Sequence, residues 1–209
     1  MKINKALLVI TSLIILLPIA AGLVLWNSLP DMIATHFGIN NEPNGWSSKA
    51  FTVFVIPGIM FVLHLVCLFV TANDPKGERI GEKSKAIVYW LLPVISVFVM
   101  GMVYANALNV SVDVGFWVCL LLGLVFVILG NYMPKARQNY TFGIKTPWTF
   151  NSEENWNRSN RVGGWAMVIA GIMMFICAFT KSFILLLSIV IVAALVPLAY
   201  SYYLYKKGI

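Results

Sequence analysis

Residues 131–164, NYMPKARQNYTFGIKTPWTFNSEENWNRSNRVGG, form the longest polar interval in a chain that is otherwise strongly apolar. The segment carries five basic residues, two adjacent acidic residues, two tryptophans and two prolines between two hydrophobic runs. This mixture is untypical of a flexible linker, which is rich in glycine and serine. We therefore expect a folded surface at the mouth of a membrane helix bundle.

The rest of the chain has the composition of a membrane protein. Of its 209 residues, 60% are hydrophobic and 11% are charged, whereas a soluble domain has about 45–50% apolar and about 25% charged residues. The apolar residues lie in solid runs of about 20, the length at which a helix crosses the hydrocarbon layer. The sequence predicts an all-α, polytopic membrane protein, one domain over residues 1–209. The expected six transmembrane helices cover residues 6–26, 51–72, 86–107, 115–133, 165–180 and 182–205, the fifth continuing a helix that begins before residue 163.

The first apolar run also has features of a signal peptide, because it follows a short basic start and contains small residues. Its length of about 20 residues and the five hydrophobic runs after it favour a retained helix.

The distribution of lysine and arginine predicts the orientation. With a cytoplasmic N-terminus, the inside segments carry 13 basic residues and the outside segments carry 2. Such residues are retained on the cytoplasmic side of membranes. We therefore expect both termini in the cytoplasm, a folded extracellular loop at 27–50, and a cytoplasmic loop with an amphipathic helix at 134–161. The net charge of +7 then requires no direct nucleic-acid partner.

Residues that could carry catalysis or bind a metal are few. The external loop contains His36 with Asp31 and Glu42 as neighbours, but these lack a metal-ligand spacing, so a structural hydrogen bond is expected. No cysteine pair or Cys/His cluster indicates a disulfide framework or a zinc site. We therefore expect that the protein is not an enzyme and that it binds no cofactor and no metal. The cysteines all lie inside apolar runs: Cys67, Cys119 and Cys177.

His64 lies in the middle of the second apolar run. An ionisable side chain inside a membrane is a functional candidate by default. The spans contain no clear carboxylate that could complete a proton relay with it. A neutral histidine, hydrogen-bonded to another helix, is therefore the favoured interpretation.

The second half of the polar interval has the signals of a helix start. Asn151 is a suitable N-cap residue and Glu154 follows three positions later, the spacing of a capping box. Glu154 and Arg158 have the favourable i,i+4 order of an ion pair. Gly163 and Gly164 would permit close helix packing or a bend.

Three interpretations of this interval remain open. It is an interfacial anchor with Trp148 and Trp156 in the aromatic belt, a docking surface for a cytoplasmic protein, or a region in which Glu153 and Glu154 form a catalytic or metal-binding pair. The third is disfavoured because adjacent helical residues point about 100° apart. The candidate residues are Lys135, Arg137, Lys145, Trp148, Glu153, Glu154, Trp156, Arg158 and Arg161.

Two segments resemble known families. Residues 29–49, LPDMIATHFGINNEPNGWSSK, resemble an N-terminal domain of unknown function found in many bacterial membrane proteins. Residues 131–164, with the run FGIKTPWT at 142–149 and RVGG at 161–164, resemble the SdpI family signature. Together, in this order, they are similar to the SdpI family of bacterial toxin-immunity proteins over essentially the full chain. One departure is Asn160, because a histidine often precedes the closing arginine in that signature.

The resemblance implies a multi-pass protein of the bacterial plasma membrane that protects its producer from a secreted toxic peptide. In the best-known system it also implies signal transduction, in which the toxin-bound protein holds a cytoplasmic transcriptional repressor at the membrane. Membrane lipids are further expected partners. The residues expected to face the toxin lie in the external loop: Asp31, His36, Phe37, Asn44 and Trp46.

Two other functions remain as alternatives, a small transporter or exporter and a membrane-embedded enzyme acting on a lipid-like substrate. A transporter needs a polar path through the spans, and an enzyme needs converging acids, bases or metal ligands. The sequence does not name the toxin, the cytoplasmic partner or the oligomeric state.

Overall fold

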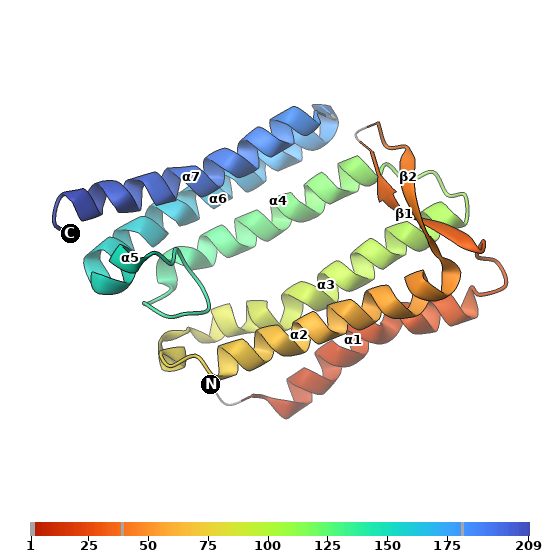
Figure 1. The fold of residues 1–209 in the computed structure, drawn as a ribbon, viewed down its shortest axis with the longest axis horizontal. Coiled ribbons are helices and arrows are strands. Elements are labelled where there is room, and N and C mark those ends of the chain that lie inside the picture. Colours follow the sequence, from red (N-terminus) through yellow and green to blue (C-terminus); the bar gives the residue numbers. More distant parts are fainter. Residues whose placement is uncertain (1–2, 39, 181) are drawn as a thin grey trace. The chain divides into compact units, whose positions relative to one another are not determined.

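The computed structural model describes residues 3–38, 40–180 and 182–209 (Figure 1). Within this part of the chain, six helices are long and apolar enough to cross a membrane, which confirms the predicted fold class. Lys2 and Lys181, which contribute to the predicted charge bias, lie outside the described residues. The six helices are α1 (Lys5–Val24), α2 (Ile56–Ala72), α3 (Glu82–Ala107), α4 (Val114–Tyr132), α6 (Glu153–Thr180) and α7 (Phe183–Lys206).

Shorter elements lie between these helices. A π-helical turn, Phe51–Val55, precedes α2 and completes its span. The 3-10 turns Gly77–Arg79 and Met133–Lys135 follow α2 and α4, and the short helix α5 (Pro147–Asn151) precedes α6. Pro134 lies in the second of these turns, as expected for a residue that blocks continuation of a helix.

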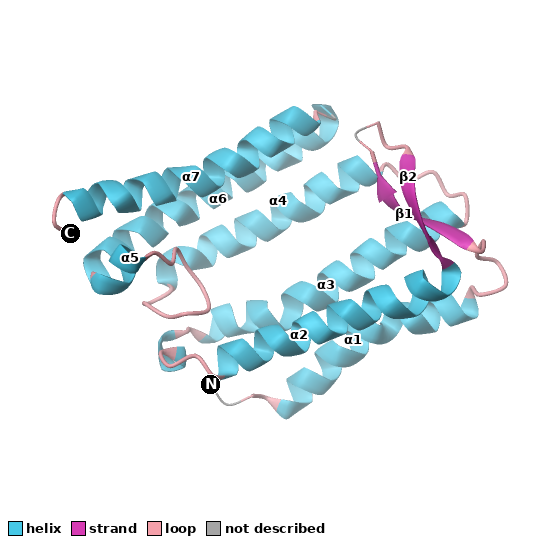
Figure 2. Cartoon of the chain, in the orientation of Figure 1, coloured by secondary structure: helices cyan, strands magenta, loops and turns pink. Residues whose placement is uncertain are grey.

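The loop between α1 and α2 is a β-hairpin, in which β1 (Met32–Phe37) pairs antiparallel with β2 (Pro43–Ser48) (Figure 2). The sequence predicts a compact loop here but no strands. The second strand, PNGWSS, is rich in residues that are depleted from strands. Its pairing therefore depends on its partner strand more than on its own propensity.

The chain divides into two compact units, which are described separately. The N-terminal unit contains the described residues up to Phe69 and Val88–Gly115, that is, α1, the hairpin, and most of α2 and α3. The C-terminal unit contains Val70–Ile87 and Phe116–Ile209, that is, the α2–α3 connection and helices α4 to α7.

In the N-terminal unit, an apolar core joins the hairpin to the helices. Polar side chains also link α3 to α1, because Tyr104 Oη donates a 2.9 Å hydrogen bond to Pro18 O and Ser96 Oγ donates a 3.1 Å bond to Ile15 O. Such bonds between membrane helices contribute about 0.6 kcal/mol on average. The buried core residues are Leu29, Ile33, Val53, Met100, Val103 and Tyr104.

In the C-terminal unit, glycines bring α4 and α6 into backbone contact. A Cβ atom on Gly171 would lie 2.5 Å from Gly123 O, and one on Gly164 would lie 2.6 Å from Gly130 O. The glycines are seven residues apart on each helix, so they fall on one face. This confirms the close packing expected at Gly164, and α6 runs through that position without interruption.

Candidate functional site: a polar cap and a hairpin

Residues 73–81 and 133–161 of the C-terminal unit fold together into one surface, which we call the polar cap. Its first turn is organised by Asn139, whose side chain is fully buried. The Asn139 Oδ1 atom accepts hydrogen bonds from Thr141 N at 2.9 Å and Phe142 N at 2.7 Å, and its Nδ2 atom donates to Arg137 O at 2.7 Å. Asparagine favours turns because its amide replaces backbone partners in this way.

A second buried amide, Asn160, joins this loop to α6. Its Oδ1 atom accepts a 2.9 Å hydrogen bond from Ile144 N, and its Nδ2 atom donates to Trp156 O at 2.9 Å. Gly143 lies beside it with φ +127°, and a Cβ there would lie 2.7 Å from Asn160 Oδ1. Glycine is therefore required at 143 both for the backbone angle and for the close approach. Asn160, where the family signature often has histidine, has a structural role here.

The two tryptophans of the cap differ in their surroundings. Trp156 is fully buried and its Nε1 atom donates a 2.8 Å hydrogen bond to Ala136 O. Its expected place in an exposed aromatic belt is therefore wrong. Trp148 is half-buried, donates from Nε1 to Ser201 Oγ at 3.0 Å, and stacks on Tyr205 with 5.6 Å between ring centroids.

The helix starts lie one residue from their predicted places. The N-cap of α6 is provided by Ser152, whose Oγ atom accepts a 3.1 Å bond from Asn155 N, so the assignment of this role to Asn151 is wrong. Asn151 instead ends α5. A capping box does occur, but at the start of α5, where Thr146 and Thr149 exchange side chain to backbone bonds.

The α2–α3 connection is part of the cap and is bound to the 138–141 segment through side-chain hydrogen bonds. Asp74 is 8% exposed, and its Oδ2 atom accepts hydrogen bonds from Tyr140 N at 2.9 Å and Thr141 Oγ1 at 2.7 Å. Lys76 Nζ donates to Gln138 Oε1 at 2.6 Å. The Asp-Pro pair at 74–75 is a turn signal, and it was the only local indication of a structural role for Asp74.

The acidic pair of the cap does not converge on one site. Glu153 Oε1 pairs with Arg79 Nη1 at 2.8 Å, and Glu154 Oε1 pairs with Arg158 Nη2 at 2.6 Å. The predicted i,i+4 pair is thus confirmed. The two carboxylates pair with different arginines, in agreement with their expected divergence on the helix. Both pairs are solvent-exposed, and such pairs contribute little to stability.

The other basic candidates of the cap are exposed. Lys145 Nζ donates to Tyr140 O at 3.0 Å and so supports the loop. Lys135 Nζ lies 4.8 Å from the centroid of the Tyr132 ring. Arg137 and Arg161 make no ion pair within the described residues.

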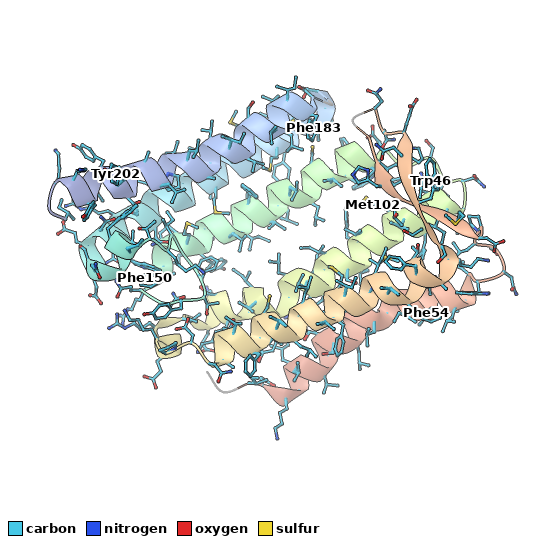
Figure 3. All side chains as sticks on the ribbon, viewed as in Figure 1. Trp46, Phe54, Met102, Phe150, Phe183 and Tyr202 are labelled. Atoms are coloured by element: carbon cyan, nitrogen blue, oxygen red, sulfur yellow. The ribbon has the colours of Figure 1, made fainter. Side chains whose placement is uncertain are left out.

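A third buried amide, Asn155, ties α6 to α7. Its Nδ2 atom donates to Ser201 O at 3.0 Å, and its Oδ1 atom accepts from Ser159 Oγ at 2.9 Å. The cap is therefore fastened to the end of α7 as well as to α6. Figure 3 shows two of the aromatic side chains at this end of the C-terminal unit, Phe150 and Tyr202.

The hairpin of the N-terminal unit carries all five residues expected to face a toxin. Trp46 is 55% exposed (Figure 3). His36 Nδ1 and Asn44 Oδ1 form a hydrogen bond between the strands, as expected for His36. Asp31 Oδ1 lies 3.4 Å from Lys49 Nζ at the base of the hairpin. Phe37 is half-buried at the end of β1.

The tip of the hairpin is attached to the α3–α4 connection. Asn41 has φ 62°, and its Oδ1 atom accepts a 2.8 Å hydrogen bond from Val114 N while its Nδ2 atom donates to Val112 O at 3.1 Å. With Ile33 in the apolar core at its base, the hairpin is held at both ends.

His64 is fully buried in the N-terminal unit. Its Nε2 atom lies 2.9 Å from Thr11 Oγ1 on α1, and that hydroxyl also donates to Leu7 O at 2.8 Å. The prediction of a hydrogen bond to another helix is confirmed.

Six membrane-length helices, a hairpin after the first helix and a folded cap between the fourth and fifth define a multi-pass membrane protein with one folded surface in each unit. Residues 135–201 match the SdpI/YfhL protein family, and residues 13–61 match a domain of unknown function, DUF1648. Immunity protein SdpI of Bacillus subtilis (strain 168) is 27% identical over 206 residues, which cover 95% of this chain and 96% of that protein. The chain is thus similar to the SdpI family in its C-terminal third and to one SdpI immunity protein along nearly its whole length. No solved structure matches it.

Proposed function

We propose that this chain is an immunity protein that protects a bacterium from a secreted toxic peptide. The observation that carries the proposal is the similarity to Immunity protein SdpI along nearly the whole of both chains. The similarity includes the hairpin segment and the cap segment, which are the two folded surfaces. Toxin binding requires no catalytic constellation, and the adjacent carboxylates Glu153 and Glu154 of the cap are each occupied by an ion pair with an arginine.

In this proposal the hairpin faces the exterior and meets the toxin. Its support is an exposed apolar surface on a rigidly attached element, with Met32 56% and Trp46 55% exposed. Exposed tryptophan is enriched among the residues that dominate binding energy at interfaces. The base and the tip are both fastened, so little ordering entropy opposes binding.

The polar cap would then lie in the cytoplasm and bind a transcriptional repressor, which makes the protein a receptor as well. The support is a folded surface with exposed arginines, Arg158 and Arg161. Arginine is enriched at binding hot spots. The positive-inside bias supports a cytoplasmic position for this surface.

The orientation is tested by cysteine labelling in intact cells. We expect an impermeant maleimide to label a Glu42→Cys variant but not a Glu78→Cys variant until the membrane is permeabilised. Both side chains are exposed, and neither forms an ion pair with another residue that the structure describes. The opposite labelling pattern would reverse the assignment of the two surfaces.

The function is tested by survival of a sensitive strain that expresses the chain and is challenged with the family's toxic peptide. We expect protection by the parent and reduced protection by Trp46→Ala. A Trp90→Ala variant is the matched control, because Trp90 is 40% exposed on α3 and lies outside the hairpin. Absence of protection by a well-expressed, inserted parent contradicts the immunity proposal.

The receptor role is tested separately with an Arg158→Ala/Arg161→Ala variant. We expect survival to be retained while the transcriptional response to a sublethal dose of the peptide is lost. An unchanged response would remove the repressor-binding role from the cap and leave the immunity proposal intact.

A further inference from the structure

A cavity of about 330 Å³ opens in the polar cap, between the α2–α3 connection and the start of α6. Its volume is at the lower end of small-molecule sites, which measure about 300–1,000 Å³. The position is independent of the hairpin and of the two arginines assigned to the docking surface. Its lining residues are Arg79, Arg137, Gln138, Glu153, Trp156 and Asn157.

The walls of this cavity are held in place by their own contacts. Trp156 is fully buried and bonded to Ala136 O. Gln138 is 6% exposed, and its Nε2 atom donates to Thr149 O and Phe150 O. A site whose walls are already fixed loses less free energy on binding than one that must be ordered.

The charges around the cavity favour an anion. The guanidinium groups of Arg79 and Arg137 line the cavity, together with one carboxylate, that of Glu153. A further cation lies near the wall, because Lys76 Nζ is 2.6 Å from Oε1 of the lining residue Gln138. Arg79 is bonded to Glu153 through Nη1, and a guanidinium has five N–H donors, so Arg79 retains donors for a ligand. Arg137 makes no ion pair within the described part of the chain.

The cavity lies close to the start of the apolar part of α6. Asn157, one of its lining residues, precedes Gly163, where that part begins, by six residues, which is about 9 Å along a helix. The headgroup layer on each side of a bilayer is about 5–8 Å thick. For a helix that crosses the bilayer upright, these lengths put Asn157 next to the outer edge of the headgroup layer.

We propose that this cavity binds a phosphate group, with Arg137 and Arg79 as the charged ligands and Asn157 as a neutral donor. Arginine suits this role because its planar fork donates two parallel hydrogen bonds to phosphate oxygens. Glu153 opposes the anion but orients Arg79. Anionic lipid headgroups and inorganic phosphate both present this chemistry, and the position near the membrane favours the lipid.

The test measures the midpoint of thermal unfolding of the full chain in detergent, with dioctanoyl phosphatidylglycerol as the probe. We expect the midpoint of the parent to rise with the lipid concentration. The affinity of the Arg137→Gln variant for the lipid should be about tenfold weaker, because loss of one charge-assisted hydrogen bond raises the dissociation constant about tenfold. Arg79→Gln/Arg137→Gln should show no rise. Arg161→Gln is the matched control, because it removes an exposed guanidinium of α6 that does not line the cavity.

The same titration with inorganic phosphate, at ionic strength matched with sodium chloride, distinguishes the two sources. An Arg137-dependent rise with phosphate as large as that with the lipid supports a phosphate site with a soluble ligand. No rise with either probe overturns the proposal. An equal rise in all variants, or with dioctanoyl phosphatidylcholine, also overturns it, because acyl chains would then be responsible. The variants' midpoints without ligand show whether each one is folded.

Discussion

The hairpin and the polar cap are both folded segments at the ends of helices, but different interactions attach each of them to its unit. The hairpin is anchored by apolar side chains, with Ile33 and Leu29 in the core of the N-terminal unit. The cap is anchored by buried amides, and Asn139, Asn155 and Asn160 are all fully buried.

The physical reason for this difference is the state of the backbone. Strands of a hairpin pair many of each other's N–H and C=O groups, so fewer of them need side-chain partners, and the side chains at its base can supply apolar anchoring. The cap contains an irregular stretch between the 3-10 turn at 133–135 and α5. Its buried backbone groups need partners from elsewhere, and the amide side chains provide them.

The largest expected effect is on the anchor of the hairpin. Ile33 is 1% exposed, and replacement of a buried isoleucine by alanine costs about 2–5 kcal/mol through lost burial and the cavity that remains. We expect Ile33→Ala to lower the free energy of unfolding in mixed micelles by about 3 kcal/mol. Met32→Ala, at an exposed position on the same strand, should change it by less than about 0.5 kcal/mol.

The next effect concerns the anchor of the cap. Asn160→Leu leaves Ile144 N–H without its acceptor, and a buried unsatisfied group costs about 1–3 kcal/mol. We expect a loss of about 2 kcal/mol and faster hydrogen exchange in residues 137–146. Asn157→Leu is the matched control, because Asn157 is exposed on the same helix. Equal effects of the two changes would contradict anchoring by buried amides.

A third prediction compares helix packing in the two units. In the C-terminal unit, a Cβ on Gly171 meets the backbone of α4, so Gly171→Ala should destabilise by about 1–3 kcal/mol. In the N-terminal unit, a Cβ on Gly101 has no atom within 4 Å, so Gly101→Ala should stabilise by about 0.5–1 kcal/mol through helix propensity. Unfolding in mixed micelles measures both, and effects of the same sign would show that backbone contact does not limit α4–α6 packing.

The smallest effect is expected for an ion pair on the surface of the cap. Glu154 and Arg158 are both about half exposed, and such helical pairs contribute about 0.3–0.5 kcal/mol. Glu154→Gln should therefore lower the stability by about 0.3 kcal/mol, and the difference should vanish in 1 M salt, where the Debye length is about 3 Å. A loss above about 1 kcal/mol would mean that surface charge, rather than buried amides, holds the cap.

The candidate residues show where sequence reasoning succeeded and where it did not. The ion pair of Glu154 with Arg158 was predictable, because i,i+4 spacing is a local property of a helix. The burial of Trp156 was not, because its hydrogen-bond partner, Ala136 O, lies 20 residues away in the chain. For the same reason the hydrogen bonds of Asp74 with residues 140 and 141 could not be predicted from its own sequence neighbours.

The sequence by itself determined the six membrane helices and their approximate ends, because an apolar run of about 20 residues is a local feature with one solution in a bilayer. It also indicated the resemblance to the SdpI family, through the motifs of the two loops. Only the tertiary structure decided that the first loop is a hairpin and that the second is a cap fastened to the α2–α3 connection and to α7. Both depend on pairing between residues distant in the chain, and no periodicity in the sequence encodes such pairing.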